Sequence, residues 1–209
     1  MPLKRSRPNT EIKFQNAVLE LVATEGCAAL GINVVAQKAG ADKVLIYRYF
    51  GDLDGLLERV AESRSWLPSA EEVLASVSHH RNDCTRYLKE LFHYMVQHIQ
   101  TDATTHQLVR WRKAHKNPLT NHFSEEWHSF WKQLITELGR SLDHEQKLDW
   151  KHAFHLIALL IESELCGEGM DYDCLETIAV NLNAPEAYEA SESHYTSDEE
   201  SDRLPTNLL

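Results

Sequence analysis

The sequence predicts an all-α protein of 209 residues, with a helix-turn-helix near its N-terminus and a longer helical domain behind it. Apolar residues recur at helical spacing through most of the chain, as expected for helices with one buried face. No segment alternates apolar and polar residues in the manner of a strand. A glycine between two alanines, at residues 39–41, indicates a narrow corner between two short helices.

The helix-turn-helix is expected at residues 32–50. Ala36 offers a small surface where a second helix presses on the first, and Gly40 can take the positive φ that ends a helix abruptly. Asp42 can accept free amide hydrogens at the start of the second helix, which we expect at residues 43–50.

The outer face of that second helix carries the side chains that a DNA major groove would meet. Lys43 and Tyr47 are four positions apart and share this face, with Arg48 to one side. Leucine at position 45 can touch a thymine methyl but cannot read guanine or adenine by hydrogen bonding. The expected DNA contacts are therefore Asn33, Lys43, Val44, Leu45, Tyr47, Arg48 and Tyr49.

The segment EGCAALGINVVAQKAGADKVLIYRYFGDLDGLL resembles the N-terminal domain of TetR-family transcriptional regulators. The matching residues are Glu25, Gly26, Val35, Ala36, Ala39, Gly40, Tyr47, Phe50, Leu56 and Leu57. The resemblance implies a homodimeric repressor whose two recognition helices enter successive major grooves of a palindromic operator on double-stranded DNA. It also implies that the later helices dimerise and enclose a small-molecule effector.

Three sites depart from the family's pattern. Gly31 stands where a threonine or serine usually begins the first helix of the pair, so a cap and a phosphate-binding hydroxyl are missing. Val44 and Leu45 replace a Gly-Thr pair, and Leu53 replaces a lysine that typically meets a phosphate. These changes leave open an alternative function, in which a TetR-like scaffold with weakened DNA binding serves as a ligand-binding or protein-interaction module.

Charge is distributed unevenly along the chain. Residues 1–50 hold seven Lys or Arg against four acids, whereas the rest holds 14 against 28, for a net charge of −11. A polyanion is repelled by that acidic body, so only the N-terminal part is expected to approach DNA. Lys4, Arg5 and Arg7 precede the first expected helix and resemble a flexible arm that binds phosphates or a minor groove. A basic terminus without a partner is the alternative.

The remaining helices follow from apolar periodicity and capping residues. They are expected at residues 10–25, 52–66, 83–100, 105–115, 120–142, 144–166 and 173–183. The segment Leu156–Ile161 is apolar nearly all round, so its helix is expected to pack against both its own domain and a partner subunit.

The chain is expected to divide into a helix-turn-helix domain at 1–62, a helical effector-binding and dimerisation domain at 63–184, and an acidic tail at 185–209. After Pro185 the tail has seven acids to one Arg, and it holds too little apolar surface to fold. No apolar run approaches the roughly 20 residues that span a bilayer, no signal peptide is evident, and the four cysteines form no CxxC pair. These features predict a cytoplasmic protein that does not contact a membrane.

Aromatic side chains on the later helices could line an effector pocket with one acidic group. The candidates are Phe92, Trp111, Trp127, Trp131 and Glu162, and packing in the core is the alternative. His152, His155 and Glu162 lie near one helix face, but no HExxH completes a metal site. We therefore expect no metal and no cofactor. Without a GxSxG, P-loop or GxGxxG motif we also expect no enzymatic activity.

Overall fold

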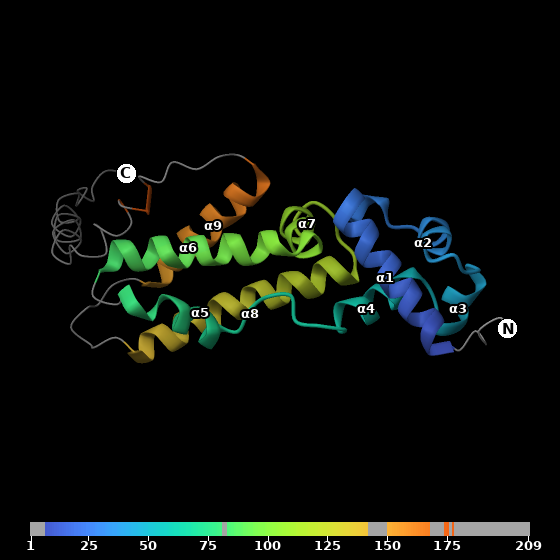
Figure 1. Cartoon of the computed structure of the whole chain (residues 1–209), viewed down its shortest axis with the longest axis horizontal. Helices are drawn as coiled ribbons and strands as arrows, with labels where there is room; N and C mark the ends of the chain where they lie inside the picture. Colours follow the sequence, from blue (N-terminus) through green and yellow to red (C-terminus); the bar gives the residue numbers. More distant parts are fainter. Residues whose placement is uncertain (1–6, 81–82, 142–149, 168–173, 176, 178–209) are drawn as a thin grey trace, which may run out of the picture.

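The computed structural model describes residues 7–80, 83–141, 150–167, 174–175 and 177. Over these residues the chain forms nine α-helices and two short 3₁₀-helices and no strand, so the predicted all-α class is confirmed. Figure 1 shows an elongated arrangement with α1, α2 and α3 at one end and α5, α6, α8 and α9 at the other. Helices α4 and α7 lie between the two ends.

The first four helices are here called the head. They are α1 (Arg7–Glu25), α2 (Ile32–Ala39), α3 (Val44–Phe50) and α4 (Leu53–Ala61), with a 3₁₀ turn at Cys27–Ala29. Buried apolar side chains of α1 form the centre of the head, among them Phe14 and Val18. The Phe14 ring meets Phe50 edge-on with centroids 6.2 Å apart, which fixes the end of α3 against α1.

Helices α1 and α4 each differ from expectation at one boundary. Helix α1 begins at Arg7 rather than Thr10. Helix α4 begins after Asp52 as predicted, because the Asp52 carboxylate accepts the Gly55 N–H at 2.8 Å. It ends at Ala61 rather than near Trp66, and a turn at residues 62–63 follows it; the Trp66 indole N–H donates to the Ala61 carbonyl at 3.1 Å.

The other helices are here called the body. They are α5 (Ala70–Val77), α6 (Cys84–Thr101), α7 (Ala103–Trp111), α8 (Pro118–Ser141) and α9 (Trp150–Cys166), with a 3₁₀ turn at Ser78–His80. Helix α5 was not predicted, although Ser69 and Glu72 cap each other's backbone amides in a capping box. The predicted segments 142–149 and 178–183, and the tail after Pro185, lie outside the described residues.

Helix α9 is only partly covered within one chain. Ile157, Ala158 and Ile161 are buried, whereas Leu156 is 46% exposed and Leu159 is 55% exposed. The apolar segment therefore has one face in the protomer's own core and two leucines in solvent. Because Ile161 is fully buried, a charge placed there would disrupt the protomer rather than an interface.

In the described part of the chain, no helix is long and apolar enough to cross a membrane.

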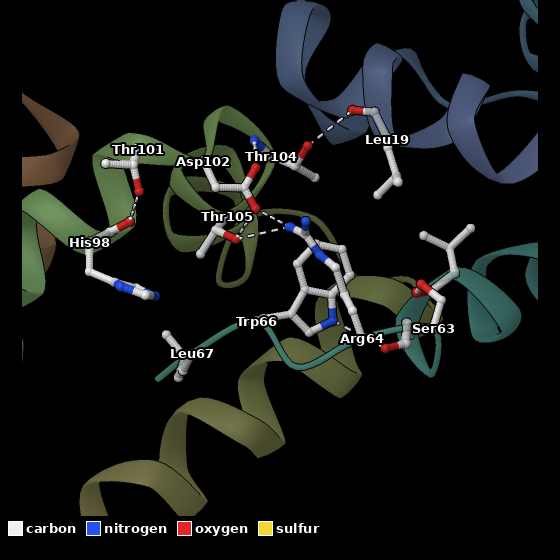
Figure 2. A network of polar contacts seen from close by, with 12 residues as sticks. Leu19, Ser63, Arg64, Trp66, Leu67, His98, Thr101, Asp102, Thr104 and Thr105 are labelled. Carbon is white, nitrogen blue, oxygen red and sulfur yellow. Dashed lines mark hydrogen bonds and ion pairs between the residues drawn. The ribbon is translucent and has the colours of Figure 1, made fainter. Parts of the chain in front are cut away.

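A polar network joins the segment after α4 to the start of α7. Figure 2 shows the Arg64 side chain between the Trp66 ring and the Asp102 carboxylate. The guanidinium lies 4.2 Å from the ring centroid and forms an ion pair with Asp102, which also accepts the Thr105 hydroxyl at 2.8 Å. The neighbouring Thr104 amide donates to Asp102 at 3.0 Å and caps α7. This cap explains why α7 begins at Ala103, two residues earlier than predicted.

The network predicts a pH-dependent contribution to stability. Burial acts to raise the pKa of Asp102, but the hydrogen bonds from Thr105, Arg64 and Thr104 outweigh it and hold the pKa below its usual value. A depressed carboxyl pKa stabilises the fold above the unfolded pKa of about 3.9, and this contribution is lost as the pH falls through the folded pKa. Asp102→Asn keeps a capping oxygen but removes the charge. We expect a lower melting temperature than wild type at pH 7 and a difference that shrinks below about pH 4. An equal difference at both pH values would contradict this.

Candidate nucleic-acid interface and internal cavity

The corner between α2 and α3 has the geometry that its sequence predicted. Gly40 ends α2 with φ 59°, in the left-handed region that favours glycine. Its amide donates to the Gln37 carbonyl at 3.1 Å, and the Ala41 amide donates to the Ala36 carbonyl at 3.1 Å. This pair of bonds is a Schellman motif, which fixes the direction in which the chain enters α3.

The first turns of α2 and α3 are joined by a side-chain hydrogen bond. The Lys43 ammonium donates to the Asn33 side-chain oxygen at 3.2 Å, and both residues are exposed. Asp42 accepts the Val44 N–H at 2.9 Å, so α3 begins at Val44 rather than at Lys43. Gly31 precedes α2 and, as expected for a glycine, gives this helix no side-chain cap. Lys43 and Asn33 thus lie together on the solvent side of the motif.

Helix α3 turns one face to the core and another to solvent. Ile46 is fully buried, while Val44 is 61% exposed and Tyr47 is 52% exposed. Arg48 is also exposed. Leu45 is half-buried against the core, so Val44 is the apolar side chain that projects furthest outward.

Tyr49 and Arg7 are placed differently from expectation. Arg7 belongs to the first turn of α1, so it is not part of a flexible arm. Its guanidinium lies 5.1 Å from the centroid of the half-buried Tyr49 ring, and its Nε donates to Glu11 at 2.6 Å. The bond to Glu11 raises the pKa of Arg7. Tyr49 is thus covered on one side by Arg7, whereas Lys4 and Arg5 lie outside the described residues.

Leu53 is the first residue of α4 and is half-buried against the core of the head. Its side chain therefore has a packing role at the position where the resemblance implies a phosphate-binding lysine. Among the described residues that follow α3 directly, Gly51 to Gly55 bring no cation to this face.

The body contains a cavity of about 660 Å³ at the end of α7, between α8 and α9. Its lining residues are Arg112, Lys113, Lys116, Ser124, Trp127, His128, Trp131, Lys132, Ile135, Thr136, His155, Ala158, Leu159 and Glu162. The Trp127 and Trp131 rings meet edge-on with centroids 5.9 Å apart. Three of the expected pocket residues, Trp127, Trp131 and Glu162, therefore lie together at this cavity.

An ion-pair cluster forms one wall of the cavity. Glu162 accepts hydrogen bonds from both Arg112 and Lys113. Arg112 is only 4% exposed, lies 4.9 Å above the Trp127 ring and has its pKa lowered by burial. Its Nε has no hydrogen-bond partner among the described residues. Sequence reasoning missed Arg112, since nothing in its spacing distinguishes it from a surface arginine.

The other two expected pocket residues lie elsewhere. Phe92 is 1% exposed in the core on α6, where packing with neighbouring helices excludes it from the cavity. Trp111 ends α7 and covers Gly26 in the head, so closely that a Cβ at Gly26 would lie 2.5 Å from the indole nitrogen. Its N–H donates to Gln107 at 3.1 Å. Trp111, the last residue of α7, therefore contacts the head, while Arg112, which directly follows α7, lines the cavity.

Of the candidate metal ligands on α9, the side chain of His152 lies outside the described part of the structure, whereas His155 and Glu162 are described. His155 lines the cavity, and Glu162 is engaged by two cations. The described residues contain no group of three His, Cys, Asp or Glu placed to hold a metal ion.

Comparison with known proteins locates a family signature in the head. Residues 16–60 match the sequence profile of the bacterial regulatory proteins of the tetR family. No curated protein matches the chain significantly in sequence.

Solved structures of regulators share the fold over most of the chain. The hemolysin II transcriptional regulator is 16% identical with a TM-score of 0.55, covering 86% of this chain and 99% of its own. A Streptomyces coelicolor A3(2) protein assigned as a transcriptional regulator is 18% identical with a TM-score of 0.51, covering 85% and 100%. A Clostridium perfringens protein assigned to the regulation of fatty acid metabolism is 15% identical with a TM-score of 0.52, covering 81% and 96%. At these identities the likeness shows a shared fold.

Proposed function

Because this chain carries the helix-turn-helix domain of the TetR family of transcriptional regulators at residues 16–60, we propose that it is a dimeric, ligand-responsive repressor. In this proposal two copies of α3 enter successive major grooves of a palindromic operator. A small molecule in the body cavity then changes the affinity for DNA.

The observation that carries the proposal is the solvent face of α3. Lys43 and Arg48 supply positive charge, Tyr47 supplies a hydroxyl, and Val44 supplies methyl groups that can meet a thymine methyl. Asn33 lies beside Lys43, so the first turn of α2 can reach the same phosphate backbone. Ile46 on the opposite face packs α3 against the core, so these charged and polar side chains have no packing role.

The proposed response to a ligand depends on α7. Arg112 lines the cavity, and the residue before it covers Gly26 in the head. At the other end of α7, the Thr104 hydroxyl donates to the Leu19 carbonyl of α1 at 3.3 Å. A ligand that moves the end of α7 would therefore shift this helix relative to α1 and to Gly26, which directly follows α1.

The proposed dimer uses the exposed face of α9. Leu156 and Leu159 are large apolar side chains left in solvent on a helix whose other face is buried. Burial of such surface against a second copy stabilises association by about 25 cal/mol per Å² of apolar area. Leu159 also lies at the edge of the cavity, so a partner subunit would narrow its opening.

The DNA contact is tested by changing charge on the proposed face and measuring mobility shifts at low and physiological salt. Lys43→Ala removes a phosphate or base contact in each subunit, and we expect about tenfold weaker binding. Leu53→Lys adds a cation in each subunit, and we expect tighter binding to specific and random DNA alike. The salt dependence of Leu53→Lys should be steeper by about two per dimer.

Lys89→Ala in α6 is the matched control, because it removes the same charge far from α3. It should bind DNA as wild type does. If Leu53→Lys changes nothing and Lys43→Ala equals the control, the α3 face does not meet DNA. The protein would then be a ligand-binding or protein-interaction module on a TetR-like scaffold, as the leucines at positions 45 and 53 allow.

A further inference from the structure

We infer that the cavity binds an organic anion: an acidic group carried on a flat apolar body. Among the described residues that line the cavity, four carry positive charge, Arg112, Lys113, Lys116 and Lys132, and one, Glu162, is a carboxylate. The whole chain has a net charge of −11, so this wall is opposite in sign to the rest of the protein. A concave site with an excess of one sign attracts ligands of the other.

The apolar part of the ligand is indicated by the apolar residues among those that line the cavity. Trp127, Trp131 and Ile135 come from α8, while Ala158 and Leu159 come from α9. The two tryptophans are largely buried and meet edge-on, so they form a rigid aromatic part of the lining against which an apolar body can pack. A volume of about 660 Å³ lies within the range of sites for small organic molecules, about 300–1,000 Å³.

Arg112 is the group on which the acid is expected to bind. Its side chain is buried, and its Nε points to no acceptor among the described residues. The residue lines the cavity, so an acid group bound there would meet a cation at the cavity wall. Glu162 already neutralises one charge and is shared between Arg112 and Lys113, so the cluster holds an excess of positive charge for a second anion.

Two further lysines bring the excess charge to the edge of the cavity. Lys132 is exposed on α8, and Lys116 donates to the Arg112 carbonyl at 3.1 Å, which holds its ammonium near the cluster. Both are distant in sequence from Glu162 and are not needed to neutralise it. They can therefore be changed while the buried pair of Arg112 and Glu162 remains intact.

The claim that this anion controls DNA binding rests on the proposed function. The claim that the anion binds in the cavity is independent of it. An acid on Arg112 would act next to Trp111, which covers Gly26 of the head. Binding of an anionic metabolite at this site would thus affect the position of α1.

The test compares two dyes with the same aromatic body on the full-length protein. 8-Anilinonaphthalene-1-sulfonate carries a sulfonate, and N-phenyl-1-naphthylamine lacks it. Fluorescence titration should give one sulfonated dye per protomer, bound about tenfold or more tightly than the uncharged dye. The double variant Lys116→Gln/Lys132→Gln should weaken the sulfonated dye by about tenfold and leave the uncharged dye unchanged.

Arg110→Gln is the matched control, since Arg110 is exposed on α7 and does not line the cavity. It should bind both dyes as wild type does. Equal affinity for the two dyes, or a double variant that binds the sulfonated dye like Arg110→Gln, would overturn the inference. Retained binding of the uncharged dye shows that the variant is folded. DNA mobility shifts on the same samples separate the two proposals, because an intact shift with failed dye results would overturn only the ligand class.

Discussion

Gly55→Ala is expected to destabilise the head by about 3 kcal/mol, at the upper end of the cost of overpacking. A Cβ at Gly55 would lie 2.1 Å from the Phe50 carbonyl oxygen, which is a backbone atom and cannot rotate away. Gly55 therefore allows the first turn of α4 to lie against the end of α3. For a chain of this size the change should lower the melting temperature by roughly 6–12 °C.

Gly31 provides the control for this prediction. It has an extended backbone with φ −160°, and a Cβ there would meet no atom within 4 Å. Gly31→Ala should cost about 1 kcal/mol or less, because alanine is a poorer N-cap than glycine, and Gly31→Ser should raise stability by a few tenths, roughly 0.3 kcal/mol, by capping α2. A Gly55→Ala variant as stable as Gly31→Ala would show that the end of α3 is not packed against α4 as described.

The double variant Leu156→Glu/Leu159→Glu is expected to convert the protein from dimer to folded monomer. Both side chains are exposed in one protomer, so the charges cost nothing in the isolated chain but oppose burial between two copies. Loss of the second head should weaken operator binding by about 10²-fold or more, because both half-sites are no longer engaged together. Sedimentation at micromolar concentration measures whether the variant is a monomer, and circular dichroism measures whether it is folded.

Ile12→Glu is the control for the dimer, since Ile12 is 52% exposed on α1, away from α9. It should remain dimeric. A wild-type monomer at micromolar concentration, or a double variant that stays dimeric, would remove α9 from the interface.

The head could be predicted from sequence because its determinants are local. Gly40 needs a positive φ, Asp52 accepts an amide three residues ahead, and Ile46 lies on the inner face of a short helix. Each depends on neighbours within one or two turns. The start of α6 near Asp83 is also set locally, since the Asp83 carboxylate accepts the Arg86 N–H at 3.0 Å.

The body was less predictable because its features depend on contacts distant in sequence. Helix α5 is an exception, because Ala70, Val73, Leu74 and Val77 recur at helical spacing after the capping box at Ser69, and the prediction missed these local signals. Helical spacing placed Trp111 on an inner face, but it could not show that the neighbour is Gly26 in the head rather than the cavity. Periodicity gives the buried face of a helix and not the partner that covers it.

The chemistry of the cavity was the least predictable part. Trp127, Trp131 and Glu162 were expected there, yet the cations that give the site its sign were not. Arg112 lies 50 positions before Glu162, its ion-pair partner. Pairing over such a distance is decided by how α7 and α9 pack, which no local pattern records.

Sequencing of random duplexes retained by the wild-type protein at physiological salt tests the proposed DNA recognition most directly. We expect an enriched inverted repeat, whose half-site centres are separated by about one helical turn, on the order of 10 base pairs, or a multiple of it. The same selection with Lys43→Ala should relax the preference at one position in each half-site if this lysine touches a base. A retained pool with the same sequence composition as the starting pool would contradict the account.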